Sequence, residues 1–257
     1  MEIGKWILRK MNSWKFGYIN KGFYSRNRAY PLLGIDTFIS DEDFVNPIYY
    51  DKFIKDTEIT KQVKALLDEN KKNFITISTM GTHPPYNYFM FDEYDEWITV
   101  EGLNEEYTLV FNNYIQKLRV LDQMFGEMVE CIQESGTNTL LIAYGDHYPH
   151  MYQTLESIGL IHKNDKNITP QEYPNLFETP YIIYSTCDEN ISVREKMTPN
   201  SLGIYILENV KLENIPWFYQ VIYEYCLNHK SVEDYHMVQY DEMFGEKYWR
   251  NMNGEGE

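Results

Sequence analysis

The chain has 257 residues and a formal net charge of -16, because 39 Asp and Glu residues outnumber 23 Lys and Arg residues. That length suits one large α/β domain or two small ones, and we favour a single domain spanning residues 1–257. The acidic balance argues against nucleic acid as a partner, since a polyanion needs a basic surface. An anionic small molecule stays possible only where Arg, His or a metal is placed locally.

Three cysteines, Cys131, Cys187 and Cys226, lie far apart and form no Cys-x-x-Cys spacing. They predict buried free thiols rather than a zinc ribbon or a disulfide framework. The sequence contains no apolar run of about 18 residues and no apolar signal-peptide core near Met1. We therefore expect a soluble chain without an export signal or membrane span.

The first third of the chain mixes loops with two regular elements. Residues 5–10 suggest a short helix, and residues 14–30, rich in Gly, Asn, Arg and aromatics, suggest a structured loop. Residues 57–70 place apolar side chains on one side at helical spacing. Residues 73–79 alternate and are β-branched, which predicts a strand.

The middle of the chain contains its most regular pattern. Residues 105–135 step apolar side chains by threes and fours and precede Gly136, so they predict a long scaffold helix to which we assign no chemistry. The apolar run at residues 139–144 then predicts a second strand. Strand, helix and strand together predict a parallel crossover within a mostly parallel central sheet flanked by helices. Further along the chain we expect a strand at 180–185, helices at 201–208 and 216–229, and a frayed tail at 251–257.

Polar residues follow both predicted strands. His83 lies in a loop that contains Gly81 and two prolines after the first strand, and Asp146 and His147 follow Gly145 after the second. Because parallel strands place their carboxyl ends on one edge, we expect the two motifs to converge. An adjacent Asp and His can simply cap a helix, but this setting favours ligands for a divalent metal such as manganese or zinc.

His83 has two possible roles. It can be a turn histidine satisfied by backbone, or it can be held by the Pro-Pro segment to bind an anionic group or protonate a leaving oxygen, which we favour. His150 suggests no specific role and reads as a supporting or surface residue.

The segment around Arg26 also has two interpretations. Its guanidinium can be an ordinary solvated side chain, or it can grip a phosphate with Tyr24 beside it to stack or hydrogen-bond. Arg28 is the less favoured neighbour.

Four segments together resemble the sulfatase-like lipoteichoic acid synthase and phosphoglycerol transferase family, in order and in spacing. They are Gly22-Phe-Tyr-Ser-Arg-Asn-Arg-Ala-Tyr30, Leu33-Gly-Ile-Asp-Thr-Phe38, Ser78-Thr-Met-Gly-Thr-His-Pro-Pro-Tyr86 and Tyr144-Gly-Asp-His147. The resemblance runs from about Phe23 to the helix after Pro216. It covers what looks like the C-terminal part of the family's catalytic domain, so we expect the N-terminal part of that domain to be missing.

The resemblance implies an alkaline-phosphatase-like α/β fold and a manganese-type metal. Asp146 and His147 match the family's late pair of metal ligands. His83 matches the histidine that contacts the phosphoglycerol group, and Arg26 and Tyr24 match the arginine and aromatic of its substrate-binding segment. Family members carry N-terminal membrane helices and act on the outer face of the cell membrane, so a membrane would be reached only through segments absent from this sequence.

The sequence also departs from the family pattern. We find neither the family's early acidic ligand nor its Thr nucleophile, so no catalytic nucleophile is assigned and the metal site is expected to be incomplete.

Three hypotheses follow from these matches and departures. The first is the C-terminal portion of a metal-dependent phosphoglycerol transferase or sulfatase-like hydrolase, inactive alone, which acts on phosphodiesters or sulfate esters of small molecules or lipid head groups. The second is a non-catalytic module of the same fold that binds an anionic glycan or glycerophosphate. The third is a purely structural domain or partner subunit.

Overall fold

The computed structural model describes residues 12–17, 20–50, 53–67, 71–162, 174–187, 191, 196–209 and 240. Contacts divide the chain into two compact units, Leu8–Cys187 in one and Met1–Ile7 with Asp188–Glu257 in the other. All candidate site residues belong to the first unit. The helices predicted at 5–10 and 216–229 and the tail at 251–257 lie outside the described residues.

A three-stranded parallel sheet with the order β2-β1-β5 positions the first candidate residues. Its strands are β1 (Asn12–Gly17), β2 (Thr37–Ile39) and β5 (Asn73–Ser78). Strand β5 confirms the strand predicted at 73–79. The loop predicted at 14–30 is wrong at both ends. Residues 14–17 belong to β1, a central strand whose backbone hydrogen bonds are completed on both sides by neighbours distant in sequence. Residues 26–30 are helical, closed by backbone hydrogen bonds within the turn, so among the described residues only those between these two elements lack a long regular element.

Short elements connect these strands. After β1 come the 3-10 turn η1 (Phe23–Ser25) and the helix α2 (Arg26–Leu33), and after β2 comes the 3-10 turn η2 (Asp41–Asp43). Strands β3 (Tyr49–Tyr50) and β4 (Phe53–Ile54) pair antiparallel and lead into α3 (Thr57–Lys64). Helix α3 confirms the start of the helix predicted at 57–70 but is shorter.

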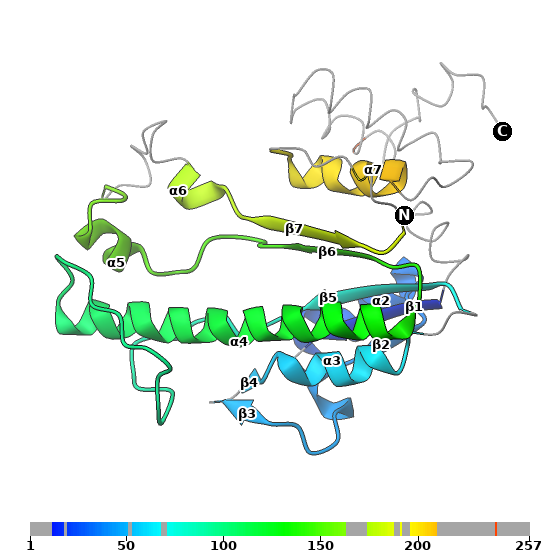
Figure 1. Cartoon of the computed structure of the whole chain (residues 1–257), viewed down its shortest axis with the longest axis horizontal. Coiled ribbons are helices and arrows are strands. Elements are labelled where there is room, and N and C mark those ends of the chain that lie inside the picture. The colour runs from blue at the N-terminus through cyan, green and yellow to red at the C-terminus, as the bar shows by residue number, and fades with distance from the viewer. Residues whose placement is uncertain are drawn as a thin grey trace. The chain divides into compact units, whose positions relative to one another are not determined.

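The long helix α4 (Glu105–Ser135) has the predicted bounds. At its start Tyr107 N–H donates to the Asn104 side chain, and at its end Gly136 adopts the left-handed conformation with φ of 66°. Helix α4 lies between α3 on one side and β6–β7 on the other (Figure 1). The buried core joins its last turns to β4 and α3 through Ile54, Ile59, Val63, Met124, Met128 and Ile132.

Strands β6 (Leu140–Tyr144) and β7 (Tyr181–Ser185) confirm the strands predicted at 139–144 and 180–185. They pair antiparallel with each other, and among the described strands β6 does not pair with β5. The parallel crossover and the single mostly parallel sheet are therefore not found; the described strands form three small sheets. Sequence order suggested β5 as a neighbour of β6, whereas the described partner of β6 is the later strand β7.

The remaining described elements are short helices. Helices α5 (Tyr152–Ser157) and α6 (Pro174–Phe177) precede β7, and α7 (Pro199–Asn209) in the second unit confirms the helix predicted at 201–208. Cys131 is half-buried but Cys187 is exposed, so the prediction of a buried thiol is wrong for Cys187. No helix in the described part of the chain is both long and apolar enough to cross a bilayer.

Candidate functional site

Arg26 begins α2 and folds back against the carboxyl end of β1. Its Nη1 atom lies 3.1 Å from where a Cβ on Gly17 would stand, so the glycine makes room for the guanidinium. That Nη1 is buried and has no hydrogen-bond partner among the described residues. A buried charged donor without a partner is unfavourable, and an anion bound at this edge of the sheet would satisfy it.

Tyr24 lies beside the guanidinium in an uncommon backbone conformation. Both Tyr24 and Ser25 have φ of 53°, in the left-handed region that bulky residues rarely adopt. The centroids of the Phe23 and Tyr24 rings lie 5.8 and 5.9 Å from the Arg26 guanidinium carbon, and Tyr24 is 80% exposed. The strained turn thus presents an open aromatic ring next to a cation, which suits stacking or hydrogen bonding to a substrate.

His83 follows β5, whose last residue Ser78 pairs with Gly17 at the end of β1. The His83 backbone N–H donates to the Met80 carbonyl at 3.0 Å, and the exposed ring places Nδ1 2.8 Å from the Pro84 carbonyl. Because a carbonyl can only accept, this contact assigns the proton to Nδ1. The other nitrogen, Nε2, then accepts when the ring is neutral and donates when the ring is protonated.

A buried polar group lies beneath this loop. The Gly81 N–H donates to Asp56 Oδ1 at 3.3 Å, and a side chain on Gly81 would collide with the Asp56 carboxyl and the Tyr50 hydroxyl. Burial raises the pKa of Asp56 to about 7, opposed by the backbone N–H groups of Gly81 and Met80 and by the Lys117 ammonium. Burial, and then the nearby Asp56 carboxylate, raise the pKa of Tyr50.

Asp146 and His147 follow β6 at a turn that two hydrogen bonds hold. Gly145 N–H donates to the Pro180 carbonyl at 3.1 Å, and Thr179 Oγ1 donates to the Gly145 carbonyl at 2.7 Å. His147 Nδ1 lies 2.8 Å from the Tyr148 carbonyl, so Nδ1 carries the proton and Nε2 is the nitrogen suited to a metal.

The geometry of the pair fits part of a metal site. His147 Nε2 and Asp146 Oδ2 are 3.8 Å apart, so one ion with bonds of about 2.0–2.2 Å can reach both. Both side chains are exposed, and the described residues contain no group of three side chains able to hold a metal. The His150 ring lies 5.4 Å from the His147 ring, centroid to centroid. The donor set within the described residues is therefore incomplete, and we derive no chemical step through an ion.

The structure relates the motifs to one another in two ways. Arg26 and His83 lie beyond the carboxyl ends of adjacent parallel strands. Tyr86, three residues after His83, contacts Tyr114 of α4 at 5.8 Å between ring centroids, and Tyr148, next to His147, packs in a core cluster with Tyr114. No described hydrogen bond or ring contact joins Arg26 or His83 directly to the Asp146–His147 pair, so one shared site stays a prediction.

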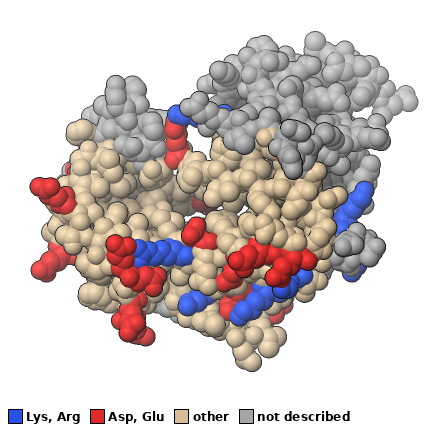
Figure 2. All heavy atoms as spheres, in the orientation of Figure 1, with Lys and Arg blue, Asp and Glu red and all other residues tan. Residues whose placement is uncertain are grey.

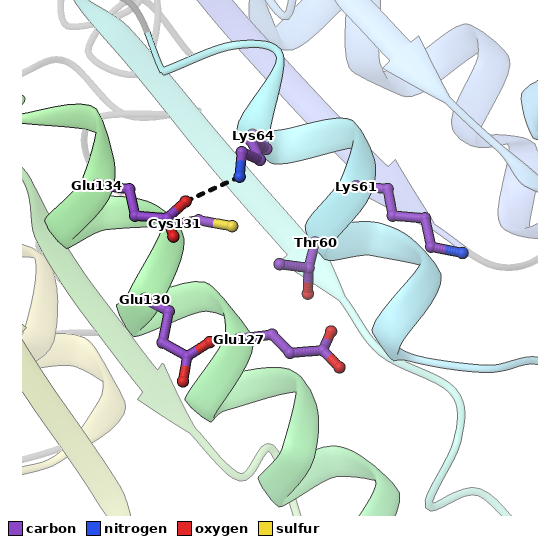
Figure 3. A pocket seen from close by; sticks show the side chains of 7 residues that line it. All are labelled: Thr60, Lys61, Lys64, Glu127, Glu130, Cys131 and Glu134. Carbon is purple, nitrogen blue, oxygen red and sulfur yellow. Dashed lines mark hydrogen bonds and ion pairs between the residues drawn. The ribbon is translucent and has the colours of Figure 1, made fainter.

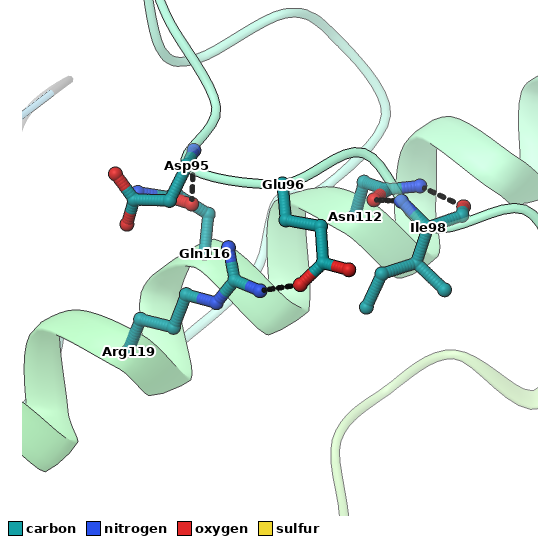
Figure 4. A network of polar contacts seen from close by, with 6 residues as sticks. All are labelled: Asp95, Glu96, Ile98, Asn112, Gln116 and Arg119. Atoms are coloured by element: carbon teal, nitrogen blue, oxygen red, sulfur yellow. Dashed lines mark hydrogen bonds and ion pairs between the residues drawn. The ribbon is translucent and has the colours of Figure 1, made fainter.

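Sequence reasoning missed the polar face of α4. Asn113 Nδ2 donates to the carbonyls of Tyr86 and Tyr88 at 2.6 and 2.8 Å, and its Oδ1 accepts from the Tyr94 hydroxyl. One turn on, Lys117 donates to the His83 carbonyl at 2.6 Å. Figure 4 shows further contacts of this face with residues 95–98, made by Asn112, Gln116 and Arg119. The sequence shows only polar residues at i, i+1, i+4 and i+5 of a predicted helix, and their burial is seen in the structure.

A surface pocket between α3 and α4 lies apart from the motif residues (Figure 3). It is lined by Thr60, Lys61, Lys64, Glu127, Glu130, Cys131 and Glu134. Lys64 and Glu134 form an ion pair across it at 2.8 Å. Acidic and basic side chains are interspersed on the molecular face in Figure 2, where the described residues show no broad basic area. Neither feature identifies a ligand.

Comparisons with known proteins identify a family and one distant relative. The sulfatase family model matches residues 7–199. A putative cyclic β-1,2-glucan modification protein of Rhizobium meliloti is 24% identical over 90% of this chain and 42% of its own length.

Two solved structures show the same fold. The Streptococcus pyogenes phosphoglycerol transferase GacH, solved in complex with sn-glycerol-1-phosphate, matches with a TM-score of 0.71 and 18% identity over 95% of this chain and 64% of that one. The lipoteichoic acid synthase LtaP of Listeria monocytogenes matches with a TM-score of 0.55 and 18% identity over 73% of this chain and 47% of that one. The chain thus spans less than two thirds of each of these three proteins.

Proposed function

The chain belongs to the Sulfatase family, and from that premise we propose that it is the phosphoester-binding portion of a metal-dependent phosphoglycerol transferase or related sulfatase-like hydrolase. The ligand class is a small anionic phosphodiester or sulfate ester, free or as the head group of a cell-envelope lipid or glycan. Glycerol phosphate is the leading candidate because GacH was solved with sn-glycerol-1-phosphate. The proposed place of action is the outer face of the cell membrane.

The observation that carries this proposal is the buried Arg26 Nη1, for which the described part of the chain offers no hydrogen-bond partner. A guanidinium presents paired donors that match the oxygens of a phosphoryl group. Binding an anion there would repay the cost of burying the donor, while Tyr24 covers the ligand from the side.

His83 would contribute from the neighbouring strand end. Its protonated ring offers the Nε2–H to a phosphoryl oxygen or to a leaving oxygen, while the Nδ1–H stays bound to the Pro84 carbonyl. The ring therefore keeps its orientation in both protonation states, which suits a group that binds an anion and transfers a proton.

Asp146 and His147 would hold part of a divalent metal site. Bound there, such an ion would polarise a phosphoryl or sulfuryl oxygen, and manganese is our leading candidate. We assign no Thr of this sequence as nucleophile, so we expect this polypeptide alone to bind its ligand without turning it over.

One observation favours a second candidate function, a non-catalytic module that binds an anionic glycan or glycerophosphate. Among the described residues no third metal donor groups with Asp146 and His147, whose side chains are both exposed. A site that binds phosphate through Arg26 and His83 needs no metal.

The test is titration of the 257-residue chain with sn-glycerol-1-phosphate, followed by NMR. Arg26→Met should weaken binding about 10- to 100-fold, the usual value of hydrogen bonds to a charged group. Arg28→Met is the matched control and should bind like the wild type. Equal binding by both variants, or none by the wild type at millimolar ligand, would refute the proposal.

A second assay can exclude the non-catalytic function, because only turnover by this chain contradicts it. Manganese-dependent hydrolysis of bis(p-nitrophenyl) phosphate that disappears in His147→Ala would exclude the non-catalytic alternative and our expectation of inactivity. Ligand binding without turnover, at any manganese concentration, would support the non-catalytic alternative and would equally fit our expectation that this chain alone is inactive.

A further inference from the structure

Helix α4 carries a buried charge that the proposed function does not use. Lys117 has a relative exposure of 0% although it is a lysine in the middle of a long helix. Burying an ammonium is costly unless polar groups surround it. The surroundings of Lys117 therefore show what the charge does.

Those surroundings are the loop that carries His83. The Lys117 Nζ atom lies 2.6 Å from the His83 carbonyl and 3.3 Å from the Pro85 carbonyl. It also lies 5.0 Å from the centroid of the Tyr86 ring and 5.6 Å from that of Phe53. Two carbonyl dipoles and two aromatic faces thus compensate a single cation.

The loop is held from its other end by a carboxyl group. Asp56 accepts the Gly81 N–H at 3.3 Å, and its charge interacts with that of Lys117. Gly81 and His83 are two residues apart, so the backbone between them is fixed by α4 on one side and by the residue preceding α3 on the other. The backbone that carries the His83 side chain is consequently held on two sides, although the imidazole itself is exposed.

We propose that Lys117 is a positioning residue for His83. The Lys117 ammonium fixes the carbonyls of His83 and Pro85, and it thereby orients the His83 imidazole with Nε2 toward the anion-binding edge of the sheet. The role in ligand binding rests on the proposed function, whereas the role in ordering the loop does not. Lys117 touches no substrate; it acts through the His83 backbone, while the Nδ1–H contact with Pro84 fixes the ring.

The experiment compares three variants of the full chain. Lys117→Met keeps the length and bulk of the side chain but removes its donors, and Lys117→Arg keeps the charge. Arg119→Met is the matched control, because Arg119 is a cation on the same helix that pairs with Glu96 at 2.9 Å rather than with His83. Lys117→Gln, which retains a donor, serves if the methionine variant does not fold.

Three readouts are made on each variant. Hydrogen exchange reports the four amides of residues 81–86 that are not proline, including the His83 N–H that donates to Met80. Imidazole NMR of labelled histidine, assigned with His83→Gln, reports the orientation of the ring. Titration with sn-glycerol-1-phosphate reports affinity.

In Lys117→Met, or in Lys117→Gln if needed, exchange at 81–86 should rise about tenfold or more, the His83 signal should move, and the Kd should weaken by a similar factor. Lys117→Arg should recover part of each effect, and Arg119→Met should show none. A folded neutral variant with wild-type exchange and a wild-type His83 signal would overturn the proposal. If the wild type binds no glycerol phosphate, the proposed function fails, while exchange and the imidazole signal still decide the role of Lys117.

Discussion

Replacing Asp56 with Asn should change how the stability of the chain depends on pH. Burial raises the pKa of Asp56 from 3.8 to about 7 in the folded chain. Between those values the unfolded chain has lost the proton and the folded chain retains it, so the free energy of unfolding falls as pH rises. The free energy of unfolding falls by about 1.4 kcal/mol for each pH unit in this range, so its total decrease between about pH 4 and pH 7 is roughly 4 kcal/mol at most.

The assay is urea unfolding of wild type and Asp56→Asn at several pH values from 4 to 8. The asparagine can still accept the Gly81 N–H but cannot ionise, so the two proteins should be similar at pH 4. The variant should become progressively more stable than the wild type as pH rises to 7, and the difference should then level off. Exposed Asp92→Asn is the control and should follow the wild type. Parallel stability curves for Asp56→Asn and wild type would refute the reasoning.

Further predictions concern packing, loop anchoring and thiol reactivity. Gly81→Ala should destabilise the chain by about 1–3 kcal/mol, because the added methyl would collide with the Asp56 carboxyl. Gly126→Ala on α4 should stabilise the chain by about 0.5–1 kcal/mol, because there is open space around Gly126 and alanine favours the helix. Thermal unfolding checks both variants. Asn113→Ala should raise amide exchange across residues 86–94, because it removes the hydrogen bonds that the Asn113 side chain donates to the backbone carbonyls of Tyr86 and Tyr88. Cys187 should react with maleimide faster than Cys131 in mass spectrometry, because Cys187 is exposed whereas burial and nearby glutamates raise the Cys131 pKa.

The long-range part of the fold could not be read from periodicity. Strand β5 and helix α4 were predicted within a residue of their bounds, because each carries its own repeat of apolar side chains. Strand β1 was missed, since Asn-Ser-Trp-Lys-Phe-Gly has a weak strand pattern and owes its conformation to β2 and β5. The partner of β6 was missed for the same reason, because local sequence does not state which strand lies beside it.

For the candidate site, too, local motifs in the sequence indicate some residues, and only the structure indicates the others. Arg26, His83 and the Asp146–His147 pair were chosen from motifs, and the structure adds the buried Nη1 of Arg26 and the assigned tautomers of both histidines. Lys117 does not stand out in the sequence, because the apolar stripe of α4 is enough to predict a scaffold helix. A lysine within a run of Asn and Gln at helical spacing becomes informative only when its burial is known.

The central claim is that the phosphate-binding residues and the Asp146–His147 pair form one site. Manganese is paramagnetic, so the direct measurement is broadening of the ³¹P signal of bound sn-glycerol-1-phosphate and of the His147 imidazole signal as Mn²⁺ is added. We expect both signals to broaden together in the wild type, with the ³¹P effect relative to free ligand lost in His147→Ala. A bound ligand whose ³¹P signal is unaffected while His147 broadens would contradict a shared site.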